Sequence, residues 1–438
     1  MKKLFAAILA LGLIVAFSAT ASAVDVKVSG SYYVVGVYDN QPSLNDATPY
    51  SRSYFYQRIR IQPEFKIAEG LSFTARMDAM EGNWDVNRAK FASGGGNTGF
   101  DWERGYVTFA SGIGKFDVGY MSAGKFGLDW ADSETTRPRI KLTTKMGPVL
   151  LIAIYEKWTE NSVNQAWSNG STANKTADAD GAAYYLAPIY NFKGGQTGVL
   201  YGYINFNNTR TAGFRTTKQI LHPYLKTSFG SFIVEAELNY IFGKKMEFDS
   251  GVGGTDVKYN GWGAYLMAKT NVGPATIGAQ LGWSQGDDPD TADKDESGPG
   301  KGADWNPALI LFNDDLATWS GGDMNTSGSG AAPNFSKPAG VYGNNGMQIF
   351  NIFADYKVTP KFMAGAALTY AKADKVVAGW EKTYGTEFDV KATYKLYDNL
   401  SYMVGAGYLW TGDYYKGLNG AAKTDNDYIL MNKLTLSF

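Results

Sequence analysis

Apolar and polar residues alternate with a period of two along most of the chain. In "YFYQRIRIQPEFKI", residues 54–67, one face carries charged, amide and tyrosine side chains, and the other carries phenylalanine and isoleucine. The stretches 231–242 and 386–396 repeat this pattern. Because successive side chains of a strand point to opposite faces, each stretch is predicted to be a strand with one apolar and one polar face.

The connections between these predicted strands alternate in length. Short turns are predicted at 69–70, 112–114, 147–148, 193–196, 230–231, 273–274, 359–360 and 398–399. Longer segments rich in Gly, Asn, Asp and Ser lie near 39–53, 82–99, 122–136, 159–179, 207–214, 244–256, 286–345, 373–383 and 413–425. Eight turns and nine loops make 17 connections, which predicts 18 strands. Sixteen is the alternative if 197–206 is not a strand.

Short turns at one end and long loops at the other are typical of an all-β, transmembrane antiparallel β-barrel of the outer-membrane type. The soluble alternative, a large β-sandwich or β-helix, should have a polar outer face. Here the regular face is apolar, and it ends in aromatic residues of the kind that form an interfacial girdle. These are Trp262, Trp283, Tyr370, Tyr408 and Trp410.

The N-terminal segment has the features of a secretory signal peptide. Lys2 and Lys3 precede an apolar run over residues 4–17, and "SATASA" follows it. This run is too short to span a bilayer as a helix, and cleavage is expected after Ala23. The domain organisation is therefore predicted to be a signal peptide over 1–23 and a barrel over 24–438.

Composition narrows the possible chemistry. The chain has 52 Gly, 29 Tyr, 24 Phe and 11 Trp but no Cys. The absence of Cys excludes disulfides, thiolate metal sites and c-type haem attachment, and no cofactor or metal is expected. The formal net charge of -1 gives no reason to expect a nucleic-acid partner.

Two stretches resemble the general porins of Gram-negative bacteria. "ERGYVTFASGIGKFDVGYMSAGKFG", residues 103–127, resembles the porin hairpin that precedes the constriction loop, although Gly119 and Tyr120 stand where those porins often have Gly-Arg. The C-terminal "KLTLSF" is similar to the porin assembly signal. The resemblance implies a passive outer-membrane channel for small hydrophilic solutes and ions, a homotrimer, and a third loop that folds into the lumen.

Charged residues near the predicted third loop form the candidate constriction. Eight of the ten arginines precede residue 140. A basic wall is predicted from residues on the polar faces of neighbouring strands: Arg58, Arg60, Arg76, Arg104, Arg139 and Lys141. The third loop, 122–136, carries Asp129, Asp132 and Glu134. Opposed charges of this kind would create a transverse field that filters solutes. In the alternative interpretation, these charges only pair across strands.

Aromatic residues share the polar face of that sector. Tyr54, Tyr56, Trp102 and Tyr106 have the inward parity of the predicted basic wall. They could form a stacking surface for sugars, or they could be rim residues near the strand ends. His222 is also predicted to face the lumen, as a polar wall residue rather than part of a catalytic set, and no enzymatic activity is expected.

The long segment 286–345 contains two unusual stretches. Its acidic run is either a solvated surface loop or a divalent-cation site formed by Asp287, Asp288, Asp290, Asp293 and Asp295. The apolar "ALILF", residues 308–312, should not lie bare in water. We therefore expect it to enter the barrel mouth or to contact a neighbouring subunit.

Several functions remain open beside the passive channel. The runner-up is a substrate-specific channel, and another class is a structural or adhesive barrel that acts through its long acidic loop. The sheath of an electron conduit ranks last. In the final strand, 427–438, Asn432 has the lipid-facing parity, which indicates either a subunit contact or an error of register.

Overall fold

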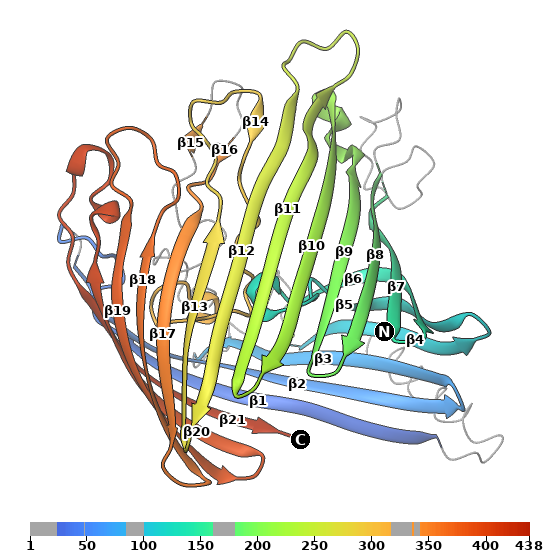
Figure 1. The fold of residues 1–438 in the computed structure, drawn as a ribbon, viewed down its shortest axis with the longest axis horizontal. Helices are drawn as coiled ribbons and strands as arrows, with labels where there is room; N and C mark the ends of the chain where they lie inside the picture. The colour runs from blue at the N-terminus through green and yellow to red at the C-terminus, as the bar shows by residue number, and fades with distance from the viewer. Residues whose placement is uncertain (1–23, 48, 85–99, 161–179, 317–334, 337–341) are drawn as a thin grey trace, which may run out of the picture.

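Eighteen long strands form one closed antiparallel barrel (Figure 1). The computed structural model describes residues 24–47, 49–84, 100–160, 180–316, 335–336 and 342–438. The strands of the barrel are β1 (Asp25–Asp39), β2 (Arg52–Ala68), β3 (Leu71–Asn83), β4 (Phe100–Ser111), β5 (Gly114–Ala123), β6 (Thr135–Met146), β7 (Val149–Thr159), β8 (Gly181–Phe192), β9 (Gly195–Phe206), β10 (Phe214–Phe229), β11 (Phe232–Phe248), β12 (Val257–Val272), β13 (Ala275–Ser284), β17 (Met347–Lys357), β18 (Phe362–Lys372), β19 (Thr383–Tyr397), β20 (Leu400–Thr411) and β21 (Asp427–Ser437).

Short elements decorate the connections. They are the strands β14 (Lys294–Asp295), β15 (Phe335–Ser336) and β16 (Tyr342–Gly343), and the 3-10 helices η2 (Asp129–Ala131), η4 (Asn207–Ala212), η5 (Asp413–Lys416) and η6 (Leu418–Gly420). Among the described residues, no helix is long and apolar enough to cross a membrane. The predicted signal peptide, residues 1–23, lies outside the described part of the chain.

The ring closes through the first and last strands. β1 pairs with β21 in antiparallel register, with Tyr33 opposite Thr435, and the Gly30 backbone N–H donates to the Phe438 carbonyl at 2.8 Å. Closure removes the free edges that would otherwise leave backbone groups unpaired. The weak stretch 197–206 is strand β9, so the prediction of 18 strands is confirmed and the alternative of 16 is wrong.

The alternation of short and long connections is also confirmed. All eight predicted turns join adjacent paired strands. The one clear shift of boundary is at 244–256, because β11 continues to Phe248 and only 249–256 form the loop. Parts of the predicted loops 82–99, 159–179 and 286–345 lie outside the described residues.

The outward face is apolar, as the period-two pattern predicts. Exposed side chains at alternate positions include Leu186, Leu266, Val390 and Leu430, with 44–51% of each accessible. Four of the five predicted girdle aromatics pack against another aromatic ring along this face. Trp262 stacks on Tyr240 at 4.0 Å, and Tyr408 contacts Trp410 at 4.9 Å. Such a surface suits contact with hydrocarbon rather than water.

Asn432 does lie on this outward face, so an error of register is not the explanation. It is paired with Gly36, and both line an outer hollow of about 380 Å³ between β1, β2, β20 and β21. A side chain on Gly36 would collide with the Asn432 amide, 2.7 Å from the position of its Cβ. A polar amide is therefore held in a recess of an otherwise apolar surface.

Candidate functional site

The third loop, which in the structure comprises residues 124–134, enters the barrel between β5 and β6. Its Leu128 backbone N–H donates to the Glu237 carboxylate at 3.1 Å. Trp130 is fully buried and stacks on Tyr265 at 5.5 Å. A Cβ on Gly282 would lie 2.3 Å from this indole, so β13 needs a glycine where the ring packs. The loop thus reaches a wall made of β11, β12 and β13.

A second segment enters the lumen from the long connection between β13 and β17. We call residues 299–316 the inner segment. Its Gly302 N–H donates to the Trp130 carbonyl at 2.6 Å, and its Asp304 N–H donates to the Asp132 carbonyl at 3.0 Å. Trp305 contacts the Trp130 ring at 4.8 Å. The two segments therefore dock on each other inside the barrel.

The apolar part of the inner segment is fixed to β19. The Glu387 carboxylate accepts the backbone N–H groups of Leu309 at 3.0 Å, Ile310 at 2.7 Å and Leu311 at 2.6 Å. Phe312 meets the Tyr384 ring edge on at 5.6 Å. These four residues, 309–312, are all buried. This confirms that "ALILF" enters the barrel, where burial and hydrogen bonding stabilise it together.

Three arginines of the predicted basic wall converge on the third loop. Glu134 binds Arg76 at 3.0 Å and Arg104 more closely, and it lies 3.7 Å from Arg60. Burial alone would raise the pKa of Glu134, but Arg104 and Arg76 outweigh it and lower that pKa to about 2. The loop carboxylate is thus charged over the whole physiological pH range.

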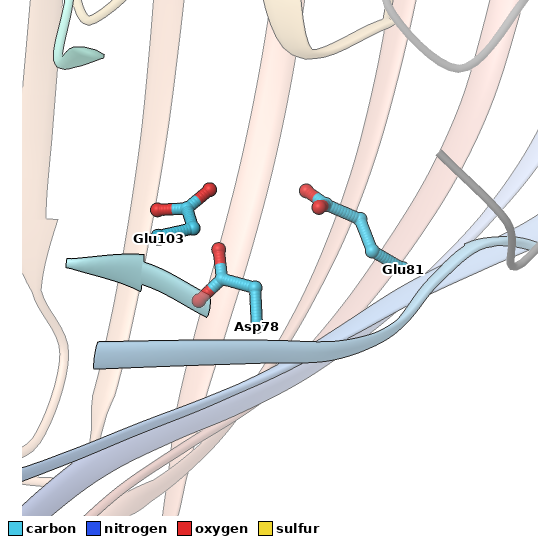
Figure 2. Close-up of side chains that lie close together, drawn as sticks. All are labelled: Asp78, Glu81 and Glu103. Carbon is cyan, nitrogen blue, oxygen red and sulfur yellow. The ribbon is translucent and has the colours of Figure 1, made fainter. Parts of the chain in front are cut away.

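The same wall also carries carboxylates that the sequence analysis did not identify. Asp78, Glu81 and Glu103 point into a common space (Figure 2), with one oxygen of each within 4.8 Å of the others. Asp78 binds Arg60 at 2.6 Å, and Glu103 binds Arg76. Arginine guanidinium groups therefore already bind these carboxylates, which belong to an ion-pair network. We call Asp78, Glu81, Glu103, Glu134, Arg60, Arg76 and Arg104 together the charged cluster.

The other three members of the predicted basic wall pair outside the charged cluster or at its edge. Arg139 binds Glu156, and Lys141 binds Asp117 at 2.8 Å. Arg58 contacts Glu81 at 3.4 Å and lies over the Tyr33 ring. For these residues the alternative interpretation, pairing across strands, describes the structure. The wall is a series of ion pairs rather than a continuous basic surface.

Among the described residues, two of the three predicted loop acids make no ion pair with the arginines. Asp129 is exposed on η2, and Asp132 turns back to accept the Phe126 backbone N–H at 2.7 Å. Burial raises the pKa of Asp132 to about 6 against that hydrogen bond, and the nearby Glu237 adds to the rise. The opposition of all three acids to the arginines therefore stays a prediction for Asp129, and Asp132 lines one cavity with Arg139 and Lys141 without pairing with them.

A β-bulge overturns the prediction for Trp102. The pairing of β3 with β4 shifts between Arg76 and Met77, so Trp102 lies opposite outward-facing Met77 and is 66% exposed. The extra residue is Glu103, whose side chain joins Arg76 in the lumen. A bulge breaks the period of two and exchanges the two faces on one side of it.

The tyrosines of this sector face inward, but Tyr56 is closed off from solutes. It is 1% exposed and packs against Tyr54 at 6.3 Å and Tyr33 at 6.2 Å. It belongs to the buried cluster that the inner segment covers. Both predictions for Tyr56, a stacking surface for sugars and a rim residue, are therefore wrong.

The acidic run of the long loop does not gather around one point among the described residues. Asp295 is buried and binds Lys245 at 2.5 Å, and Asp288 binds Lys375 at 3.3 Å. Asp287 is buried and accepts the Glu296 backbone N–H at 2.9 Å. These aspartates bind other residues of the loop and the ends of the neighbouring strands, so the interpretation as a solvated surface loop is wrong for Asp287 and Asp295.

A cavity of about 460 Å³ remains beside the two inserted segments. It lies between the third loop, Pro299 and Gly300, and the inner faces of β6 to β11. His222 lines this cavity, which confirms the prediction that it faces the lumen. Its Nε2 lies 3.0 Å from Oε1 of Glu237. The lumen is therefore narrowed but not filled by the residues that the structure describes.

The fold matches solved outer-membrane proteins although the sequence is far from theirs. No protein-family model and no curated protein matches the chain. OpdK of Pseudomonas aeruginosa superposes with a TM-score of 0.51 at 13% identity, over 94% of this chain and 99% of that one. A BenF-like porin of Pseudomonas fluorescens Pf-5 gives 0.50 at 12%, over 94% and 99%. OccAB4 of Acinetobacter baumannii gives 0.50 at 13%, over 96% and 100%. The chain therefore has the barrel fold of outer-membrane porins.

Proposed function

We propose that the protein is a bacterial outer-membrane channel for passive diffusion of small hydrophilic solutes and ions. One observation carries this proposal. A closed barrel with an apolar outer face contains an incompletely filled lumen that two inserted segments narrow. A barrel of 18 strands is wide enough to hold an aqueous path around such segments.

In this proposal the charged cluster sets the field in the constriction. Glu134 on the third loop faces Arg60, Arg76 and Arg104 on the wall, so opposite charges stand across a short distance. Fixed opposed charges orient dipolar solutes and slow apolar ones. Since most of these charges are paired, we expect weak rather than strong ion selectivity.

Planar-bilayer recording of the purified protein tests the channel. We expect stepwise current increments in potassium chloride, each from one inserted molecule or oligomer. Absence of such steps, in protein shown by circular dichroism to be folded β-structure, would contradict the proposal. It would favour the structural or adhesive barrel, for which binding of a partner by the long loop is the positive test.

A substrate-specific channel is the second candidate. The 460 Å³ cavity favours it, because this volume falls in the range of small-molecule sites. Two proteins of similar fold have been solved with small organic acids, OpdK with vanillate and OccK2 with glucuronate. This function predicts that one class of solute blocks the ion current at low concentration, whereas a general channel shows no such block.

We also propose that the protein forms a homotrimer through the outer hollow that contains Asn432. Lipid tails cannot hydrogen-bond the Asn432 amide, so a contact with another subunit would satisfy it. Native mass measurement in mild detergent tests this. Asn432→Leu should destabilise the trimer relative to the matched outward substitution Thr386→Leu, and a monomeric wild-type protein would contradict the proposal.

A further inference from the structure

One sector of the lumen wall is aliphatic. The cavity of about 460 Å³ is lined on β7, β9, β10 and β11 by Ile152, Ile154, Leu200, Ile220 and Ile241. Register places these residues on the inner face, since Ile154 lies opposite Lys141 and Ile220 lies opposite Ile241. Lumen-facing residues of a water-filled barrel are ordinarily polar. Five aliphatic side chains around one cavity therefore indicate that a ligand with apolar surface binds there.

Another group of apolar side chains in the lumen is already covered. On the opposite side, Leu309 to Phe312 of the inner segment pack against Tyr384 and neighbouring residues. In the aliphatic sector, no described residue fills the corresponding space. Apolar surface left next to water is unfavourable by about 25 cal/mol for each Å². A ligand with a hydrocarbon part would remove this surface from water.

A lysine borders the same cavity without a close carboxylate partner. Among the described residues, no carboxylate lies within ion-pair distance of Lys218, whereas Lys125, Arg139 and Lys141 each bind one. The carboxylate that interacts with Lys218 at longer range, Asp295, binds Lys245. Lys218 is two residues from Ile220 on the same face of β10. A cationic group and an aliphatic surface thus border one site.

We propose that this cavity binds a short-chain organic anion, with its carboxylate near Lys218 and its hydrocarbon chain against the isoleucines of β7, β10 and β11. This inference rests on the proposed channel function, of which it names the favoured solute class. An anion with an apolar body would pass the charged cluster and pause in the aliphatic sector, because each part of it finds a complementary surface. Sugars and simple ions would find only the polar part.

Direct binding to the detergent-solubilised protein tests the inference without relying on conduction. Calorimetric titration with butyrate, pentanoate and hexanoate, corrected with empty micelles, should show affinity rising about fourfold for each added methylene, which is about 0.8 kcal/mol. Affinity that is flat along the series would overturn the inference. Equal binding of hexylammonium and hexanoate would overturn the assignment of an anionic head group.

Paired variants locate the site. Ile154→Thr together with Ile220→Thr should flatten the series, and Lys218→Gln should weaken all three carboxylates by a similar factor. Ile189→Thr is the matched control, because Ile189 faces inward on β8 outside the cavity. An equal loss in this control would overturn the location. Missing current steps with an intact binding series would instead count against the proposed channel alone.

Discussion

The two segments inserted into the lumen differ in the contact that involves a carboxylate and charged partners, although a wall carboxylate, Glu237, also accepts one backbone N–H of the third loop. The third loop contributes a carboxylate, Glu134, and the wall contributes the arginines. For the inner segment the wall contributes the carboxylate, Glu387, and the segment contributes backbone N–H groups. The first contact is partly accessible to solvent, and the second is fully buried. Partly solvated ion pairs can act on passing solutes, whereas buried hydrogen bonds act mainly to hold structure.

This difference predicts which change affects conduction and which affects selectivity. The inner segment extends from the Trp130 contact to β19. Replacing residues 301–315 with a short Gly/Ser linker should raise single-channel conductance by about threefold or more, because ion flow follows the open cross-section of the narrowest region. Deleting 251–254, an exposed loop tip, is the control and should leave conductance unchanged.

Removing the buried contact should loosen the inner segment without deleting it. Glu387→Ala leaves the N–H groups of Leu309, Ile310 and Leu311 unpaired, and each such loss costs about 1–3 kcal/mol. We expect rapid transitions between a small and a larger conductance level in bilayer recordings. Glu235→Gln on β11 removes a wall carboxylate that binds Lys226, and a similarly unstable current in this control would contradict the explanation.

Neutralising the loop carboxylate should change selectivity while conductance stays close to wild type. Glu134→Gln leaves Arg76 and Arg104 with less neutralisation, so the constriction becomes more positive. The chloride-to-potassium permeability ratio from reversal potentials should rise by about twofold or more. Glu247→Gln breaks an ion pair with Arg215 toward the loop end of β11 and serves as the control. An unchanged ratio in Glu134→Gln would remove the charged cluster from the constriction.

The smallest expected effect is a pH dependence from Asp132. Because burial raises the pKa of Asp132 to about 6, its carboxyl is neutral below that value and charged above it. An acid whose pKa is raised in the folded protein is destabilising when it ionises, so the third loop is held best at low pH and loosens as pH rises through about 6. Cation permeability should increase over the same range.

Asp132→Asn is the direct control for that pH dependence. It keeps a side-chain oxygen for the Phe126 N–H and removes the ionisable group. The change in permeability near pH 6 should then disappear. Persistence of the same transition in Asp132→Asn would assign it to another group.

Period-two alternation was sufficient to predict the barrel, because in a barrel each strand faces the same two environments. It placed Arg60, Arg76 and Arg104 on the lumen side, where they meet. It could also have identified Asp78, which shares the parity of Arg76. The rule failed at Trp102 because a bulge at Glu103 exchanges the faces, and no residue in that stretch signals the extra position.

The inserted segments were less accessible to sequence reasoning. The apolar "ALILF" indicated burial but not which wall would cover it. Its partner Glu387 lies more than seventy residues away and looks like an ordinary lumen-facing acid. The direction of Asp132 depends on a local turn with Phe126, which alternation does not describe. Long-range contacts of loops are set by tertiary packing rather than by a local period.

Cysteine accessibility tests most directly that the inner segment lies inside the barrel. The chain has no native Cys, so a single engineered thiol reports one position. Ala308 in the inner segment is 5% exposed, and Ala421 in an outer loop is exposed, which makes Ala308→Cys and Ala421→Cys a matched pair. A membrane-impermeant maleimide should label Ala308→Cys on the order of a hundredfold more slowly, as buried sites react only through rare opening. Equal labelling rates in folded protein would contradict the account.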